Sequence, residues 1–302
     1  MSAGINTVST LKLMVRREFW EHRAFLFAPA IVAAIMVIGA LFGTNELHVG
    51  GTPDPDWLKH SDMIVSVALS GLATPFAIVM CIVTVFYLLD SLYADRKDRS
   101  VLFWKSLPIS DVKTVSSKLL TATVIVPLLT FAVIVVTNIV VAFILSVRLS
   151  GVEQLDVWNT VWQSGIWFGV HGLMLAGLFA ALLWYLPIIA WLLLASAWAR
   201  RAVILWAALP PILAMIVEEI VFDTSYVAQL LRHRIVGWTR FGDYAGRERI
   251  EIDGETMDLP RRLSDFIDLG AYLTSPGLWG GLIVAALLLY ATVLIRRRSN
   301  AI

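Results

Sequence analysis

Six long apolar stretches divide the chain, and none of them shows the strict alternation of apolar and polar residues that a half-buried β-strand would have. A membrane-spanning helix needs about 20 predominantly apolar residues. We therefore expect six spans, at 24–42, 63–92, 119–147, 166–198, 202–221 and 277–295. The fourth contains Pro187, which a membrane helix tolerates, and we expect it to form one helix. The pattern predicts an all-α membrane protein with a single transmembrane domain over residues 1–302.

The composition narrows the class of protein further. Hydrophobic residues make up 58% of the chain and charged residues 16%, whereas soluble domains have about 45–50% and about 25%. This balance excludes a disordered chain, and the continuous apolar stretches disfavour a membrane β-barrel, whose strands alternate. The single cysteine, Cys81, excludes an intramolecular disulfide and a cysteine-based metal site.

Lys and Arg are distributed unevenly over the connections between the spans. With the N-terminus inside, the inner connections and the two ends of the chain hold most of the 24 basic residues, and the two short outer connections hold only Lys59 and Arg148. Positive residues accumulate on the cytoplasmic side of membrane proteins. We therefore expect both termini in the cytoplasm and a long outer loop at 222–276.

Two connections have patterns of their own. Over residues 11–26, apolar residues recur at three- and four-residue spacing, which predicts an amphipathic helix at the cytoplasmic surface. An ordinary positive flank that only orients the first span is the alternative interpretation. In the outer loop, residues 250–253 alternate and are followed by an Asp-Gly turn, so we expect a small β-hairpin there.

The connection between the second and third spans concentrates charged and aromatic residues. Residues 95–99 mix acids and bases, an apolar run ends at Trp104, and Pro108 precedes a helix start at residues 110–111. Aromatic residues and Arg are favoured at interaction hot spots. The segment is therefore a candidate docking site for a soluble partner, although a loop that only carries orienting charge is the simpler interpretation of these residues alone.

Catalytic motifs are missing from the sequence. It contains no phosphate-binding G-x-x-x-x-G-K-[ST] loop, no His-Glu-x-x-His pattern and no Gly-x-Ser-x-Gly elbow, so we do not expect an enzyme. Ionisable residues inside spans are functional candidates because their burial is costly. Here His171, Glu218 and Glu219 are the candidates for contact with a cationic substrate or an ion. The simpler interpretation is that the two glutamates are wetted by head-group water, and we predict no metal site.

The stretches YADRKDRS (93–100), LFWKSLPIS (102–110) and SKLL (117–120) resemble the permease subunits of the ABC-2 type family of ATP-binding cassette transporters. The layout of six spans with both ends inside is similar to theirs as well. The resemblance implies that the N-terminal helix is a connecting helix, and that a coupling helix after the second span docks into a groove on a separate ATPase subunit. The residues implied in coupling are Asp95, Arg96, Lys97, Asp98, Arg99, Phe103, Trp104, Lys105 and Pro108. The long, charged outer loop departs from the family, whose members often have short re-entrant helices there.

The resemblance also implies an assembly and a function. Two permease copies, identical or related, would work with two ATPase subunits that bind ATP and Mg, while this chain would bind no cofactor; lipids are expected partners and nucleic acids are not. The leading hypothesis is the membrane-spanning subunit of an ATP-driven exporter in a bacterial inner membrane. The alternatives are a membrane scaffold that recruits a soluble partner without transport, and an ion-coupled secondary transporter. The last is disfavoured because no ionisable residue lies near the middle of a span.

Overall fold

The computed structural model describes residues 7–43, 61–98, 110–148, 158–163, 165–238, 247–252, 255–260 and 268–298. Helices dominate this part of the chain. The elements are α1 (Thr7–Glu21), α2 (Ala24–Phe42), α4 (Ser61–Lys97), α6 (Asp111–Leu120), η1 (Thr121–Ile125), α7 (Val126–Arg148), η2 (Asn159–Gln163), α8 (Ile166–Trp198), α9 (Val203–Phe222), α10 (Tyr226–Val236), β1 (Arg247–Ile252), β2 (Glu255–Pro260), α11 (Leu269–Thr274) and α12 (Pro276–Arg298).

Six helical units are long and apolar enough to cross a membrane: α2, α4, the continuous unit α6–η1–α7, α8, α9 and α12. They coincide with the six predicted spans, which confirms a helical, multi-pass membrane architecture. The second and third spans are longer than predicted, because α4 continues to Lys97 and the third span begins at Asp111. The fourth is one continuous helix through Pro187, as expected.

The third span begins with a helix that the hydropathy pattern alone does not reveal. Ser110 caps α6, since its hydroxyl accepts a hydrogen bond from the N–H of Lys113, and Asp111 in the first turn is favoured by the helix dipole. The helix then passes through the π-helical turn η1 into α7. A polar helix at the end of the bundle is thereby joined without a break to a membrane span.

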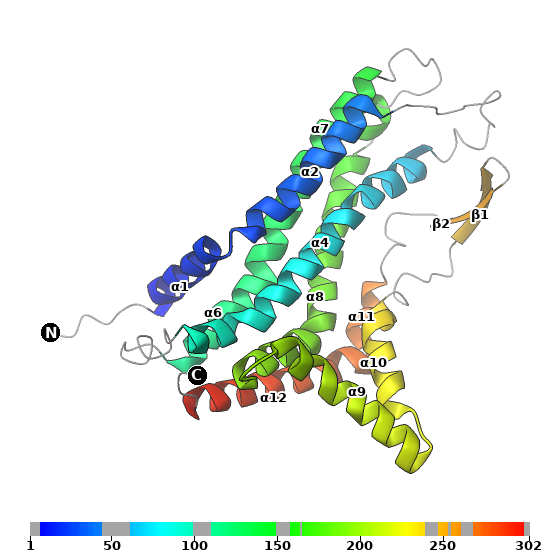
Figure 1. The fold of residues 1–302 in the computed structure, drawn as a ribbon. Coiled ribbons are helices and arrows are strands. Elements are labelled where there is room, and N and C mark those ends of the chain that lie inside the picture. Colours follow the sequence, from blue (N-terminus) through cyan, green and yellow to red (C-terminus); the bar gives the residue numbers. More distant parts are fainter. Residues whose placement is uncertain are drawn as a thin grey trace.

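The elements are arranged around α4 and α8, which pack against each other (Figure 1). The helices α2 and α7 lie side by side along α4, and α12 packs extensively on α8. The helix α1, the start of α6 and the C-terminal ends of α4 and α12 meet at one end of the bundle, which we call the terminal end (Figure 1).

The largest core cluster lies near the terminal end, where α2, α4 and α8 meet. Phe25, Leu88 and Leu193 are almost completely buried there. Within a membrane such contacts stabilise mainly through close packing, because lipid tails are as apolar as leucine side chains. The packing therefore fixes the positions of the helices that carry the polar groups described below.

The connection between α9 and α12 contains three further elements. The short helix α10 packs on α8 and α9. The strands β1 and β2 form an antiparallel pair in which Ile252 is opposite Glu255. This pair lies in the stretch for which the sequence predicts a hairpin, and the Asp-Gly turn between the strands is outside the described residues.

Candidate functional site

Five charged side chains from four helices form one buried ion-pair network at the terminal end. Lys118 of α6 lies between two carboxylates, with its Nζ 3.0 Å from Oε1 of Glu18 and 3.6 Å from Oδ2 of Asp95. Arg296 of α12 joins Asp95 to Asp111, with distances of 3.3 Å and 3.2 Å. The network thus connects α1, α4, α6 and α12 through side chains rather than through backbone.

The burial of these groups makes the network costly to break. Glu18, Asp95, Lys118 and Arg296 are each 5% exposed or less. The second oxygen of Glu18 accepts a hydrogen bond of 3.0 Å from the hydroxyl of Tyr87. Removing one partner of a buried ion pair leaves an uncompensated charge, which costs about 3–5 kcal/mol. Each of the four helices is therefore held in one position relative to the others.

A second polar contact joins α4 to α8 beside this network. The Arg96 guanidinium donates hydrogen bonds to the carbonyls of Ser196, at 2.8 Å, and Ala199. In the other direction, the hydroxyl oxygen of Ser196 accepts from the backbone N–H groups of Leu92 and Tyr93, each at 3.0 Å. Arg96 is 5% exposed, so its side chain faces the bundle rather than solvent.

The predicted coupling residues divide into three groups. Asp95 and Arg96 are buried in the contacts just described. Lys97 and Asp98 follow them and are exposed. The remaining predicted residues lie outside the described part of the chain: Arg99, Phe103, Trp104, Lys105 and Pro108. On the far side of that gap, Ser110 is exposed and begins α6.

His22 lies between α1 and α2, next to the network. Its ring meets that of Tyr87 edge-on at 4.9 Å, and its Nε2 is 3.9 Å from Oε2 of Glu18. Burial lowers the pKa of His22, and the attraction of Glu18 only partly opposes this effect. The neutral imidazole therefore fits this position better than the charged one.

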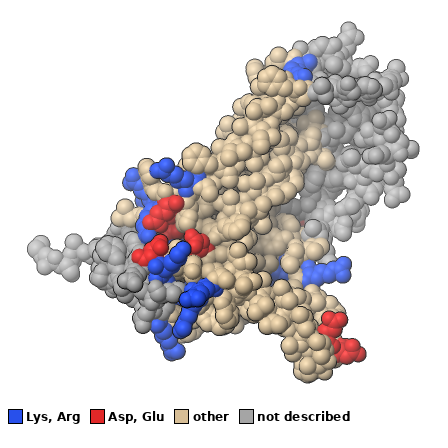
Figure 2. Space-filling model, in the orientation of Figure 1, with Lys and Arg blue, Asp and Glu red and all other residues tan. Residues whose placement is uncertain are grey.

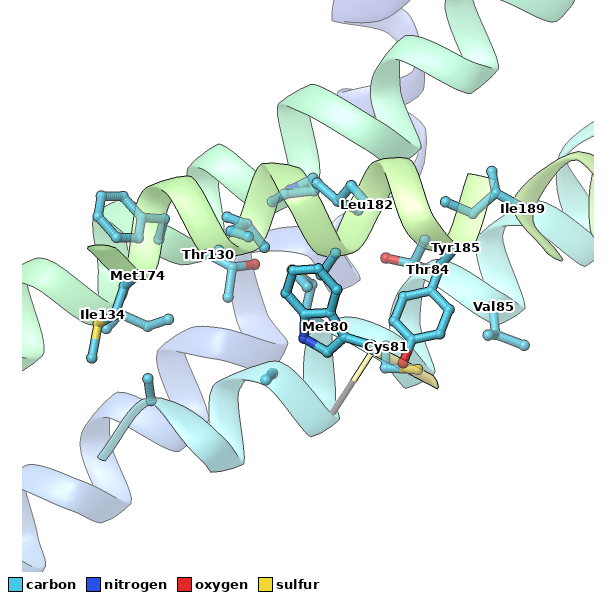
Figure 3. Close-up of a pocket in the computed structure, with 18 of the residues that line it drawn as sticks. Met80, Cys81, Thr84, Val85, Thr130, Ile134, Met174, Leu182, Tyr185 and Ile189 are labelled. Carbon is cyan, nitrogen blue, oxygen red and sulfur yellow. The ribbon is translucent and has the colours of Figure 1, made fainter. Parts of the chain in front are cut away.

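Within the spans, α4, α7 and α8 surround an apolar cavity of about 800 Å³ (Figure 3). Met80, Ile134, Met174 and Leu182 line it, and none of its lining residues is charged. Ligand sites for small molecules have volumes of about 300–1,000 Å³. The cavity is thus large enough for a small apolar molecule.

The connection between α9 and α12 covers one side of the cavity. Ile235, in the last turn of α10, and Trp238, two residues after the helix ends, are among its lining residues. Tyr185 of α8 donates a hydrogen bond of 2.9 Å to the carbonyl of Ile235. Arg234 stacks 4.6 Å above the ring of Trp184 and donates to the carbonyl of the same residue at 3.0 Å. The helix α10 is therefore attached to the middle of α8, which the sequence did not predict.

The three ionisable candidates within spans are not brought together in one site. Both ring nitrogens of His171 are engaged, with Nδ1 2.7 Å from the carbonyl of Trp167 and Nε2 3.1 Å from Nδ2 of Asn138. The carboxylate of Glu218 accepts hydrogen bonds from backbone N–H groups at the start of α10. Glu219 is exposed on α9. No group of three potential metal-ligating side chains occurs among the described residues.

The sequence did not single out Glu18, Lys118 or Arg296 as site residues. Lys118 and Arg296 have the appearance of positive flanks that orient a span. Glu18 carried a signal, because it lies four residues after Met14 and so on the apolar face of α1. A carboxylate on the face that packs inward indicates a buried cation nearby, although the sequence does not say which one.

Comparison of the chain with protein-family models, with curated proteins and with solved structures gives no match. The proposals below therefore depend on the residues and the geometry of this chain.

Proposed function

We propose that this chain is the membrane-spanning subunit of an ATP-driven exporter that works with a separate ATPase subunit. One observation carries the proposal. Arg296 of α12 pairs with Asp95, before the segment 99–109, and with Asp111, directly after it. A partner that moves this segment would thereby move α4, α6 and α12 together.

The proposal assigns an orientation to the molecule. Lys and Arg gather at the terminal end, with Asp and Glu among them (Figure 2). By the positive-inside rule, the terminal end of the bundle and both termini of the chain then face the cytoplasm. The membrane in this proposal is a bacterial inner membrane. In this arrangement α1 is the amphipathic connecting helix, the segment after α4 has the coupling role, and the β1–β2 pair lies outside.

The proposed mechanism starts in the partner subunits. Two permease copies, identical or related, bind two ATPases, which hold ATP and Mg. ATP binding closes the ATPase pair and displaces the coupling segment. The ion-pair network passes this displacement to α4 and α12, and α4 lines the apolar cavity. The cavity would change shape with the nucleotide state, as alternating access requires.

The first test is to purify the chain from its native membrane and identify what is bound to it. We expect an ATPase subunit whose hydrolysis rate in lipid nanodiscs changes on complex formation. Arg96 is a poor probe of docking because its side chain is buried against α8. The exposed residues are the better choice, and we expect the double reversal Lys97→Glu with Asp98→Lys to weaken ATPase binding.

The matched control reverses exposed charge at the same end but on another element. Arg297 and Arg298 at the end of α12 are exposed, and Arg297→Glu should leave ATPase binding unchanged. Equal binding by the Lys97/Asp98 variant and the unmodified protein would refute docking at this segment. An ATPase that binds but never responds to the permease would favour a scaffold instead. Uptake driven by an ion gradient without ATP would favour a secondary transporter.

A further inference from the structure

Three buried polar atoms without a hydrogen-bond partner lie together beyond one end of the apolar cavity. They are Oδ1 of Asn138 and the indole nitrogens of Trp162 and Trp167, and no partner for them exists among the described residues. Asn138 is fully buried and Trp167 is 9% exposed. An unsatisfied buried polar group costs about 1–3 kcal/mol relative to a satisfied one. Three of them in one place indicate a site for a polar group from outside the chain, either a water molecule or a ligand.

The hydrogen bonds around His171 define which atoms stay unpaired. Since the carbonyl of Trp167 only accepts, Nδ1 of His171 carries the proton and Nε2 accepts from Nδ2 of Asn138. The same amide nitrogen also faces the carbonyl of Leu69, at 3.5 Å. A flipped amide would place Oδ1 against that carbonyl, so the orientation is consistent and Oδ1 is the free acceptor.

Ring stacking holds the two indoles beside this amide. The rings of Trp162 and Trp167 are stacked 5.9 Å apart, and those of Trp167 and His171 4.1 Å apart. The result is a buried polar cluster, which we call the recess, with two N–H donors and one carbonyl acceptor. A hydroxyl, whether of a ligand or of a water molecule, satisfies both kinds, because it donates a hydrogen bond and accepts others.

The recess adjoins the cavity on three helices at once. Leu69 precedes Ser70 on α4, Asn138 lies one turn beyond Ile134 on α7, and His171 follows Val170 on α8. Ser70, Ile134 and Val170 all line the cavity. Phe131 lines it as well, and its ring centroid is 6.5 Å from that of His171. Phe131 therefore lies where the cavity and the recess meet.

We propose that the cavity and the recess together bind an uncharged amphiphile, with its apolar body in the cavity and a hydroxyl-bearing head at Asn138 and Trp167. A charged head group is disfavoured because no charged residue lines the cavity to pair with it. As the substrate class of the exporter this rests on the proposed function, whereas the binding itself does not require an ATPase.

Cys81 provides a native reporter of occupancy. It is the only cysteine of the chain, it is exposed, and it lines the cavity (Figure 3). From Ser70 to Cys81 the helix α4 rises by about 16 Å, and a dodecyl chain has a comparable length. A dodecyl ligand with its head in the recess should therefore slow modification of Cys81 by N-ethylmaleimide.

The experiment uses the full chain in phosphatidylcholine nanodiscs and measures Cys81 modification by intact mass. The probes are 1-dodecanol, laurate, dodecyltrimethylammonium and dodecane. We expect 1-dodecanol to protect at the lowest concentration. Loss of one hydrogen bond should raise its half-protecting concentration about fivefold to tenfold in Trp167→Phe and in Asn138→Leu. Dodecane should protect these variants and the unmodified protein equally.

The matched control is Trp191→Phe, on the same helix. The indole of Trp191 already donates to the carbonyl of Ala207, at 2.9 Å, and lies about 30 Å along α8 from His171. This variant loses a hydrogen bond yet should keep full protection by 1-dodecanol, whereas Trp167→Phe loses no bond within the protein and should lose protection. Equal protection by dodecane and 1-dodecanol in the unmodified protein, or equal loss in the two Trp variants, would overturn the proposal. Protection by laurate as strong as by 1-dodecanol would overturn the uncharged head.

Two sources of such an amphiphile give different results before any probe is added. A resident membrane lipid would leave Cys81 already protected in the purified protein, and extraction would recover a hydroxyl-bearing lipid that Asn138→Leu releases. An exchangeable solute would leave Cys81 reactive until 1-dodecanol is added. Either result supports the assigned class of ligand. None of these measurements involves an ATPase, so a failure here is distinct from a failure of the proposed export function.

Discussion

Replacement of Lys118 by methionine is the sharpest test of the buried network. The Nζ of Lys118 lies 3.0 Å from Oε1 of Glu18 and 3.6 Å from Oδ2 of Asp95. Methionine keeps most of the length and the apolar stem of the side chain but removes the charge. The variant leaves three carboxylates with one cation where the unmodified network has three carboxylates with two.

The expected cost follows from the distances. At an effective dielectric constant of about 20, unit charges 3.0 Å and 3.6 Å apart attract each other by about 5 kcal/mol per pair. Most of the attraction that the variant loses is offset, because the variant has no ammonium group that must be taken out of water on folding. The measured cost of breaking a buried ion pair is about 3–5 kcal/mol. Asp95 keeps Arg296 and Glu18 keeps the Tyr87 hydroxyl, so we expect a loss near the lower limit, about 3 kcal/mol.

The assay is chemical unfolding in mixed detergent micelles, followed by circular dichroism. The double variant Lys118→Met with Glu18→Gln should recover part of the loss, because it removes an anion together with the cation, and the double-mutant cycle measures their coupling. The matched control is Arg17→Met on α1, which removes one partner of the exposed Arg17–Glu21 pair. Exposed pairs contribute at most about 1 kcal/mol. If Lys118→Met costs no more than Arg17→Met, the buried network does not stabilise the terminal end.

Three further predictions concern other parts of the molecule. Burial lowers the pKa of His22, so the stability it contributes is complete above its ordinary pKa of 6.5 and is lost as the pH falls through the lowered value. The protection factors of the α1 amides, which are corrected for the intrinsic pH dependence of hydrogen exchange, should therefore fall as the pH is lowered below about 6.5, and less so in His22→Gln. In Gly281→Ala the new methyl group would overlap the guanidinium of Arg234, which should displace it from the carbonyls of Trp184 and Gly277 and cost about 2 kcal/mol in chemical unfolding. Gly280→Ala, with open space around it, should be neutral. Removal of the carboxylate in Glu218→Ala should accelerate hydrogen exchange at the first amides of α10, because those N–H groups lose their acceptor.

The membrane spans could be predicted because the signal is local. Each span is a continuous apolar stretch of the length that a bilayer requires, and neither its neighbours nor its position in the bundle alters that requirement. The predicted ends of the spans were less accurate where polar residues continue a helix. The third span extends back to Asp111 because Ser110 caps it, and a hydropathy pattern cannot register a helical turn that is not apolar.

The candidate site was only partly predictable because its groups come from distant parts of the chain. Lys118 pairs with a residue 100 positions away, and Arg296 with one 201 positions away. In the sequence Asp95 and Arg96 belong to the same charged run as Lys97 and Asp98. The structure separates them, since the first two face the bundle and the last two face solvent. Which of four consecutive charges is buried depends on the angle at which α4 meets α8, and no single sequence contains that angle.

Charged rather than apolar side chains join α4, α6 and α12, and this restricts how these helices can move relative to one another. An apolar contact between α6 and α12 could slide along a helix with little change in energy, because dispersion forces are not directional. Arg296 cannot do so, since it holds Asp95 and Asp111 within 3.3 Å and 3.2 Å and is 4% exposed. Displacing the segment between these two aspartates must therefore either move α12 with it or break the buried ion pairs of Arg296. The second outcome costs about 3–5 kcal/mol, so we expect the helices to move as one unit, and Arg296→Met should disconnect the segment from the spans without preventing a partner from binding to it.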